Sequence, residues 1–189
     1  MFTELVRRAR SYRRFDEADR VTEGELRELI NVARLAPSGG NMQTLRFRLL
    51  WTAEDCAALF ACVAWAGYLK DWPGPAEGER PTAYIGIVGT DECNVNTGIA
   101  AQTIQLAAAE MGIGACMIGS FNRTAAREAL RVPEELKLQL IIALGRPAET
   151  IVLEDIRASE SIEYYRDESD VHHVPKIVAA DLILGRERE

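Results

Sequence analysis

The chain has 189 residues, of which 48% are hydrophobic and 27% charged, and its formal net charge at pH 7 is -7. These values lie near the averages of soluble globular proteins, so they exclude a disordered chain, and a chain of this length buries enough apolar surface to fold without metals or disulfides. The negative charge disfavours nucleic acid as the main partner, because phosphate binding needs a dense basic surface.

The first half of the sequence predicts a helix, a loop and a strand. Thr22 and Glu25 have the spacing of a capping box, and apolar residues then recur at helical intervals until Pro37. The loop from Pro37 to Asn41 contains residues that tolerate unusual backbone angles. Apolar and arginine side chains alternate from Leu45 to Leu49, which predicts a half-buried strand.

The second half mixes strands with helices. The pattern predicts helices over 52–65, 99–108 and 122–130, and strands over 83–89, 116–119 and 138–144. The predicted order places helices first and then mixes strands with helices. This order favours an α+β sandwich over regular βαβ winding. We expect one domain over 1–154 and a C-terminal arm over 155–189 that packs on something else, such as a second subunit.

Membrane insertion, secretion and metal binding are not expected. The apolar stretch from Ile99 to Met117 is interrupted by polar residues and glycines, so it is too broken for a bilayer span. No signal-peptide pattern opens the sequence, which predicts a cytoplasmic protein. The cysteines form no C-x-x-C pair and have no histidine at ligand spacing. His172 and His173 are expected to point apart, in a solvated or interface role.

Arginines crowd a short N-terminal segment at Arg7, Arg8, Arg10, Arg13 and Arg14, with Ser11 among them. Guanidinium groups bind phosphate through paired hydrogen bonds and stay charged at any working pH, so this cluster suggests a small anionic ligand. Two alternatives remain at this point, namely a solvated helix face paired with acidic neighbours and a segment that binds nucleic acid.

Four segments, taken in order, resemble the nitroreductase family of FMN enzymes. They are Arg10-Ser11-Tyr12-Arg13-Arg14-Phe15, Ala36-Pro37-Ser38-Gly39-Gly40-Asn41-Met42-Gln43, Gly98-Ile99-Ala100-Ala101-Gln102 and Gly112-Ile113-Gly114-Ala115-Cys116-Met117-Ile118-Gly119-Ser120-Phe121. The tail, with Tyr164-Tyr165-Arg166-Asp167 and His172-His173-Val174-Pro175-Lys176, resembles a small-chain branch of that family. The match runs through most of the chain.

The resemblance implies a fold and an assembly. The expected fold is a nitroreductase-like α+β sandwich with a mainly antiparallel central sheet flanked by helices. The expected assembly is a homodimer that exchanges its C-terminal arms and carries its active sites at the interface. Non-covalent FMN is the implied cofactor, NADH or NADPH the hydride donor, and a small molecule the acceptor, with neither nucleic acid nor a membrane as partner.

The resemblance also assigns roles to individual residues. Arg10 and Ser11 match contacts on the phosphate side of FMN, and Arg13 matches a basic residue beside the N1 and O2 edge of the ring. Gly119 and Ser120 match backbone close to the reactive N5. Further cofactor contacts are implied for Ile118, for Lys176 at the phosphate, and for the interface loop residues Pro37, Ser38, Gly39, Asn41 and Gln43. Ala9 stands where the family often has a second arginine, a loss for which Arg8 is expected to compensate.

The implied reaction is reduction of planar, electron-poor acceptors such as nitroaromatics, quinones or enones by a ping-pong mechanism. The flavin itself performs hydride transfer, which explains why no acid, base or nucleophile stands out in the sequence. Trp65, Tyr68 and Trp72 lie in a region that forms part of the active-site rim in the family, so they are candidate substrate contacts. Their alternative role is to seal the edge of the core.

Two other classes of function stay open at the level of sequence. The first is a flavin-binding carrier or regulatory protein without turnover. The second is a nucleic-acid or partner-binding module built on the N-terminal arginines.

Overall fold

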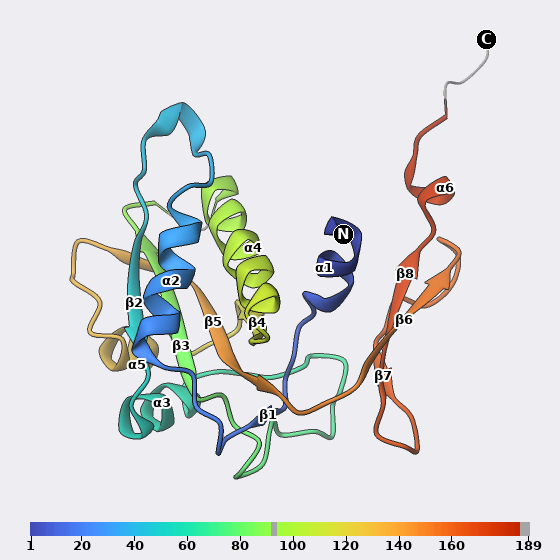
Figure 1. The fold of residues 1–189 in the computed structure, drawn as a ribbon, viewed down its shortest axis with the longest axis horizontal. Helices are drawn as coiled ribbons and strands as arrows, with labels where there is room; N and C mark the ends of the chain where they lie inside the picture. Colours follow the sequence, from blue (N-terminus) through green and yellow to red (C-terminus); the bar gives the residue numbers. More distant parts are fainter. Residues whose placement is uncertain (92–93, 186–189) are drawn as a thin grey trace. The chain divides into compact units, whose positions relative to one another are not determined.

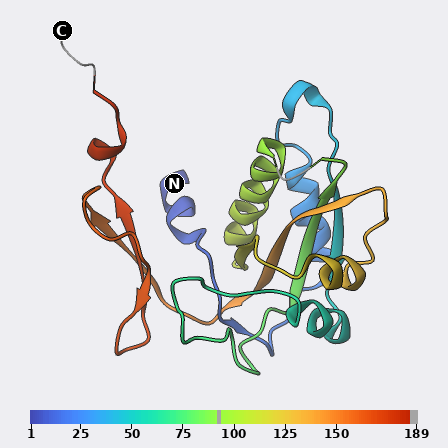
Figure 2. The ribbon, with the colours of Figure 1, turned by 180° about the vertical axis from the view of Figure 1, so that it is seen from behind.

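The computed structural model describes residues 1–91 and 94–185 and divides them into two compact units. The first unit comprises Met1–Trp65 and Pro73–Ala148, and the second comprises Ala66–Trp72 and the chain from Glu149 onward. Figures 1 and 2 show the chain from opposite sides.

A five-stranded sheet forms the centre of the first unit (Figure 1). Its longest strand, β5, pairs antiparallel with β3, β4 and β1, and β3 pairs antiparallel with β2. The strands are β1 (Phe15–Asp16), β2 (Arg46–Leu50), β3 (Ala83–Gly89), β4 (Gly114–Ile118) and β5 (Lys137–Pro147). All residues of β3 are buried, as expected for a strand covered on both faces.

Helices cover both faces of this sheet. Helices α2 (Glu23–Ala33) and α4 (Val95–Glu110) pack on one face, where they meet Ile85 and Ile142 in one core cluster. Helices α3 (Ala53–Phe60) and α5 (Arg123–Ala129) pack on the other face, against Tyr84 and Ile141. Because neighbouring residues of a strand point to opposite faces, β3 and β5 supply both cores. The α+β sandwich with a central antiparallel sheet is confirmed.

Local signals set several element boundaries. The Thr22 hydroxyl accepts a hydrogen bond from the Glu25 main-chain N at 3.2 Å and the Glu25 carboxylate accepts one from the Thr22 main-chain N at 2.8 Å, which confirms the capping box. Helix α3 ends at Phe60 rather than near Trp65. The reason is a competing interaction, because Val63 forms an antiparallel bridge with Phe121.

Helix α4 is anchored to the sheet at its N-terminal end. Asn94 caps the helix by accepting hydrogen bonds from the main-chain N of Asn96 and Thr97. The buried Thr97 hydroxyl is hydrogen-bonded to Gln139 of β5, whose amide also donates to the Asp91 carbonyl at 2.7 Å. These bonds fix the helix along its axis.

The second unit contains a small sheet. Strand β8 (His172–Ile177) pairs parallel with β6 (Ile151–Ile156) and antiparallel with β7 (Tyr165–Arg166), and α6 (Ala179–Leu182) follows. We call residues 149–185 the C-terminal arm. The expected division after residue 154 falls inside β6, and the second unit also includes Ala66–Trp72, a segment that the sequence did not link to the arm.

The two neighbouring histidines of β8 point apart, as expected from strand geometry. His172 is fully buried, so the expectation of a solvated or interface role was wrong for this residue within its own unit. His173 lies between two carboxylates, with Nδ1 2.7 Å from Glu154 and Nε2 3.1 Å from Asp167. The Tyr165 ring stacks on His173 at 4.8 Å between centroids.

This arrangement predicts that the protection of the arm's main-chain amides from hydrogen exchange depends on pH. Hydrogen bonds that His173 donates to the Asp167 carboxylate, and then to that of Glu154, raise the pKa of His173, and the bond that Asp167 accepts lowers the pKa of Asp167. Because the pKa of His173 is raised on folding, its bonds stabilise the folded arm fully at pH values below the unfolded-state pKa of about 6.5. This stabilisation is lost as pH rises through the folded-state pKa. The lowered Asp167 pKa gives stability that is lost as pH falls through that folded pKa.

The measurement is hydrogen exchange of the β6 and β8 amides, corrected for the intrinsic effect of pH on exchange. Protection should be highest between the two transitions and decline on the alkaline side. His173→Gln should remove the alkaline decline, and its persistence in this variant would contradict the role of His173.

Candidate functional site

The N-terminal arginine segment runs along the outer edge of β4. Ser11 forms a parallel bridge with Ala115, and the Tyr12 main-chain N donates a hydrogen bond to the Ala115 carbonyl at 3.0 Å. The chain then continues to Phe15, which pairs with the end of β5. The segment therefore has a fixed register against the sheet.

Two facing glycines allow this close approach. Gly114 of β4 pairs directly with Gly145 of β5. A Cβ atom on Gly114 would lie 3.0 Å from Cγ of Tyr12, and one on Gly145 would lie 2.8 Å from Cβ of the fully buried Phe15. The missing side chains thus leave the space into which the segment packs.

Arg10 is held on this segment but keeps a free hydrogen-bond donor. Its carbonyl accepts a bond from the buried Gln105 side chain of α4 at 3.0 Å, and its Nη2 donates to the Val6 carbonyl at 2.6 Å. Its Nε is buried and has no hydrogen-bond partner in the described part of the chain. Burial lowers the pKa of Arg10, which means that the site favours an added anion.

The other predicted arginines have different surroundings. Arg13 is half-buried and donates from Nη1 to the Ser11 carbonyl at 3.3 Å. Arg8 is the last residue of α1 (Phe2–Arg8) and is exposed. Arg14 pairs with Glu79 at 3.3 Å, so its charge is engaged within the protein. Arg10, Ser11 and Arg13 are the members of the cluster that the fold keeps together beside β4.

The opposite end of β4 exposes backbone. Ile118 is buried, whereas Gly119 and Ser120 beyond it are exposed, and a Cβ on Gly119 would meet no atom within 4 Å. The Ser120 carbonyl accepts a hydrogen bond from the Ala64 main-chain N at 2.9 Å. A flat ligand can therefore approach this backbone closely, and the approach is bordered by the chain around Ala64.

The predicted interface loop adopts an unusual backbone conformation. The residues Gly40, Asn41 and Gln43 have positive φ angles of 56°, 52° and 49°. The Ser38 hydroxyl accepts a bond from the Gln43 main-chain N at 3.3 Å, and Asn96 of α4 accepts one from the Gly39 main-chain N at 2.9 Å. Two non-glycine residues in the left-handed region are strained, a feature that clusters at functional sites.

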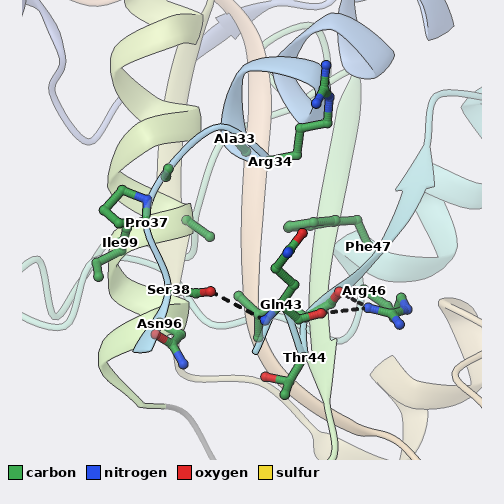
Figure 3. A pocket seen from close by; sticks show the side chains of 13 residues that line it. Ala33, Arg34, Pro37, Ser38, Gln43, Thr44, Arg46, Phe47, Asn96 and Ile99 are labelled. Atoms are coloured by element: carbon green, nitrogen blue, oxygen red, sulfur yellow. Dashed lines mark hydrogen bonds between the residues drawn. The ribbon is translucent and has the colours of Figure 1, made fainter. Parts of the chain in front are cut away.

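A pocket of about 230 Å³ lies behind this loop, between the end of α2, the start of β2 and the first turns of α4 (Figure 3). Figure 3 shows the Ser38–Gln43 bond at its wall and Asn96 and Ile99 on the helix side. Most of its surface is apolar, with Ala33, Phe47 and Ile99 among the lining residues. Its volume is below the roughly 300 Å³ at which ligand pockets usually begin, so by itself it is not a complete cofactor site.

The loop and the arginine segment lie at different ends of α4. The loop is bonded to Asn96 near the helix start, whereas the arginine segment is bonded to Gln105 in its second half. At 1.5 Å per residue, these two anchors are separated by roughly 13 Å along the helix. The two anchors therefore set the loop and the arginine segment apart along α4.

The predicted aromatic contacts are divided between the two units. Trp65 belongs to the first unit, where its ring packs 5.9 Å from Phe60 and lies against Gly74. Tyr68 and Trp72 belong to the second unit and contact Tyr164 and Arg166 of the arm. Lys176, the predicted late phosphate contact, is an exposed residue of β8 in the second unit.

Sequence reasoning missed three residues that build this site. Gln105 is one of the polar residues that interrupt the apolar stretch from Ile99 to Met117, yet it is only 7% exposed and holds Arg10. Asn96 holds the loop, and Gly145 makes room for Phe15. A glutamine in an otherwise apolar helix was the one signal available, because a buried polar side chain needs a partner.

Residues 1–91 and 94–185 contain no group of three histidine, cysteine, aspartate or glutamate side chains that could hold a metal ion. They also contain no helix that is long and apolar enough to cross a membrane. Cys93 lies outside the described residues.

The comparisons with known proteins agree with the fold. A model of the nitroreductase family matches residues 6–74 and 82–146, which is more than half of the chain. An FMN-dependent nitroreductase from Clostridium difficile R20291 is 26% identical, with 86% of this chain and 90% of that chain covered and a TM-score of 0.58. A nitroreductase family protein from Clostridium novyi NT is 23% identical, with 78% and 86% covered and a TM-score of 0.65.

A third structure, of a nitroreductase family protein from Streptococcus pneumoniae TIGR4, is 17% identical, with 85% of this chain and 95% of that chain covered and a TM-score of 0.64. These likenesses extend over most of each chain, and the matched residues include the arginine segment, the strained loop and β4 with the backbone that follows it. The chain belongs to the nitroreductase family.

Proposed function

We propose that the protein is an FMN-dependent NAD(P)H oxidoreductase that reduces small, planar, electron-poor acceptors by a ping-pong mechanism. The observation that carries this proposal is the arginine segment on β4, with a buried Arg10 Nε that lacks a hydrogen-bond partner in the described chain. Membership of the nitroreductase family and the similarity to an FMN-dependent nitroreductase support it.

The residues present fit FMN at both of its ends. Arg10 and Ser11 offer donors to a phosphate, with Arg8 as a further cation, and a guanidinium binds phosphate through directed hydrogen bonds. Lys176, in the second unit, is proposed as a further phosphate contact from the family resemblance alone. Arg13 and the exposed backbone of Gly119 and Ser120 offer a positive charge and N–H donors to the ring. Bound there, FMN would supply the chemistry of hydride transfer from NAD(P)H and of electron transfer to the acceptor.

The chain's own residues contribute position and charge to this reaction. Arg13 offers a guanidinium, and the backbone of Gly119 and Ser120 offers N–H donors. The open space over Gly119 permits a planar molecule to lie against the backbone. We infer that donor and acceptor use the same open face in turn, which gives ping-pong kinetics.

We further propose that the active unit is a homodimer in which the loop from Pro37 to Gln43 completes the site of the partner subunit. The separation of this loop from Arg10 along α4 supports the proposal. Three large apolar side chains at or beside the loop are exposed, namely Leu35 at 69%, Met42 at 65% and Val95 at 78%. Such exposure is typical of surfaces that bind another protein. Exchange of the C-terminal arms remains part of this proposal.

The direct test is an absorbance spectrum of the purified protein, followed by release and mass measurement of the cofactor. We expect an oxidised flavin spectrum, bleaching by NADH or NADPH without oxygen, and recovery of the spectrum on addition of a quinone or a nitroaromatic compound. Bleaching without recovery would favour a flavin carrier without turnover. A colourless protein that takes up no FMN would contradict the proposal.

The assignment of the two ends predicts different phenotypes for two substitutions. Arg13→Ala should lower the reduction potential of bound FMN by about 20–40 mV, which corresponds to roughly 1–2 kcal/mol for two electrons, and should slow its reduction by NAD(P)H. Lys176→Ala should weaken FMN retention with the potential nearly unchanged. Potentials from dye equilibration and dissociation constants from fluorescence titration measure both effects. Exchange of the two phenotypes would overturn the assignment.

A further inference from the structure

Positive charge gathers on helix α5 and the chain that follows it, although the net charge of the protein is -7. Two neighbouring cavities of about 310 and 440 Å³ lie there, and both have Thr124 and Arg127 in their walls. Glu128 is the one acid among the described residues that line them. Four lining residues are cations, here called with Thr124 the α5 patch: Arg123, Arg127, Arg131 and Lys137.

The α5 patch is distinct from the candidate cofactor contacts on α4. All of its residues belong to the first unit. Helix α5 packs on the face of the sheet that carries Tyr84 and Ile141, whereas α4, which holds the arginine segment and the loop, packs on the other face. Pockets for small ligands usually have volumes of roughly 300–1,000 Å³, so either cavity is large enough for part or all of a small molecule.

Two arginines of the patch are oriented by neutral groups. Nη2 of Arg127 donates to the Pro133 carbonyl at 3.3 Å, and the Arg123 guanidinium lies 5.5 Å from the centroid of the Phe121 ring. Neither arginine forms an ion pair with an acid within residues 1–91 and 94–185. A carbonyl or an aromatic ring directs a guanidinium without cancelling its charge, so both charges can act on an anion in the cavities.

The spacing of the arginines opposes helix stability. Arg123 and Arg127 lie one turn apart on the same side of α5, and Arg131 comes four residues later, just beyond the end of the helix. Like charges four residues apart destabilise a helix. The sequence thus places cations together at the cavities against the preference of the helix itself.

Arg131 has a second local cost. Its φ angle is 49°, in the left-handed region that favours glycine, and its main-chain N donates to the Glu128 carbonyl at 2.9 Å to close the helix end. The Arg131 guanidinium lies 3.3 Å from Asp55, and the Arg131 carbonyl accepts a bond from Arg48 of β2 at 2.7 Å. Glycine would end the helix without this strain, and strained residues cluster at functional sites.

We propose that the α5 patch binds a small molecule that carries two linked phosphate groups. One phosphate bears about two negative charges near neutral pH, and a guanidinium binds it through paired hydrogen bonds. Four cations exceed what one phosphate needs, whereas two phosphates can occupy both cavities and share Arg127 and the Thr124 hydroxyl. The inference depends neither on FMN nor on the proposed reaction.

Calorimetric titration of the purified protein with inorganic pyrophosphate, at fixed ionic strength, tests this inference. Pyrophosphate should bind at least about tenfold tighter than orthophosphate, because it reaches both cavities. Arg127→Gln should weaken its binding about tenfold and Arg123→Gln about threefold to tenfold, since each removes a charged donor. Glu128→Gln should tighten it about twofold to fivefold because the acid is lost, a gain that damage to the fold would not produce.

Two control variants locate the binding. Arg27→Gln removes an exposed arginine of α2 that pairs with Glu23 at 2.6 Å, so it changes the net charge by the same amount as Arg127→Gln. Arg10→Ala removes a cation of the candidate phosphate site. Both should leave the pyrophosphate dissociation constant within a factor of about two, because exposed charges far from a ligand are screened by salt.

Competition by NADH identifies the source of the two phosphates. Displacement of pyrophosphate by NADH would assign the patch to the diphosphate of a dinucleotide, and no displacement would assign it to another small molecule with linked phosphates. Pyrophosphate binding that is absent, or no tighter than that of orthophosphate, would overturn the inference. Equal weakening in Arg127→Gln and Arg27→Gln, or loss of binding in Arg10→Ala with retention in Arg127→Gln, would overturn it as well.

Discussion

Arg10→Ala is expected to weaken FMN binding by about tenfold to a hundredfold while the protein stays folded. The buried Arg10 Nε has no hydrogen-bond partner in the described chain, and burial lowers the pKa of Arg10. A bound anion would therefore give this buried guanidinium the hydrogen bond and the opposite charge that it lacks. A hydrogen bond between charged groups contributes about 1.5–3 kcal/mol, which corresponds to this loss of affinity. Fluorescence titration of the apoprotein with FMN measures the dissociation constant.

A neighbouring arginine provides the control. Arg7 lies on α1, three residues before Arg10, is exposed, and was not assigned to the cofactor, so Arg7→Ala should leave the FMN dissociation constant within a factor of about two. An equal loss in both variants would show that only the overall charge of the segment matters. An unchanged dissociation constant in Arg10→Ala would remove Arg10 from the site.

Gly145→Val is expected to destabilise the first unit by about 3 kcal/mol and to reduce FMN affinity as well. Its Cβ would lie 2.8 Å from Cβ, Cγ and Cδ1 of Phe15. Phe15 is fully buried and its Cβ is attached to paired backbone, so it cannot turn away, and overpacking of this kind costs about 1–3 kcal/mol or more. The arginine segment would then shift off β4, and with it the residues proposed to bind the phosphate.

Chemical denaturation followed by circular dichroism measures the loss, and Gly24→Ala is the control. The added methyl at Gly24 meets only the Thr22 hydroxyl oxygen at an ordinary 3.9 Å, so the free energy of unfolding should be unchanged or higher. A Gly145→Val protein with wild-type stability would show that the segment adjusts easily. Normal stability with lost FMN binding would confine the effect to the site.

Elements whose signals are local were predictable from the sequence. The capping box at Thr22 fixed the start of α2, and the apolar run over Ala83–Gly89 matched β3 as the structure has it. In both cases the deciding interactions lie within the element or along one strand. The end of α3 was misplaced because the deciding contact, between Val63 and Phe121, is distant in sequence.

The arm was the hardest part to predict. Its strands are short, and β8 contains Pro175, which cannot donate to a neighbouring strand. The pattern therefore predicted no strand in this part of the chain, and β6 was divided between the expected domain and the expected arm. Its link to the segment Ala66–Trp72 joins Trp72 to Arg166, far apart in the chain, and no local periodicity signals such a contact.

The residues of the candidate site were foreseeable from the family resemblance, but their arrangement was not. The motifs named Arg10, Ser38 and Gly119 without showing that the first two are anchored at different ends of α4. The separation is set by Gln105, which bonds the arginine segment, and by Asn96, which bonds the loop. Side-chain amides have no periodic pattern that reveals a distant partner.

The central claim is that the arginine segment of one subunit and the loop of the other form each FMN site. A heterodimer of an Arg10→Ala chain and a Ser38→Ala, Asn41→Ala chain, isolated with two different affinity tags, tests it directly by FMN titration. In a two-fold dimer, one site then receives both intact parts and the other receives both defects. The account predicts that the heterodimer binds FMN at about half of its sites with near wild-type affinity, whereas both homodimers bind weakly. A heterodimer that binds as weakly as the two homodimers at every site would contradict it.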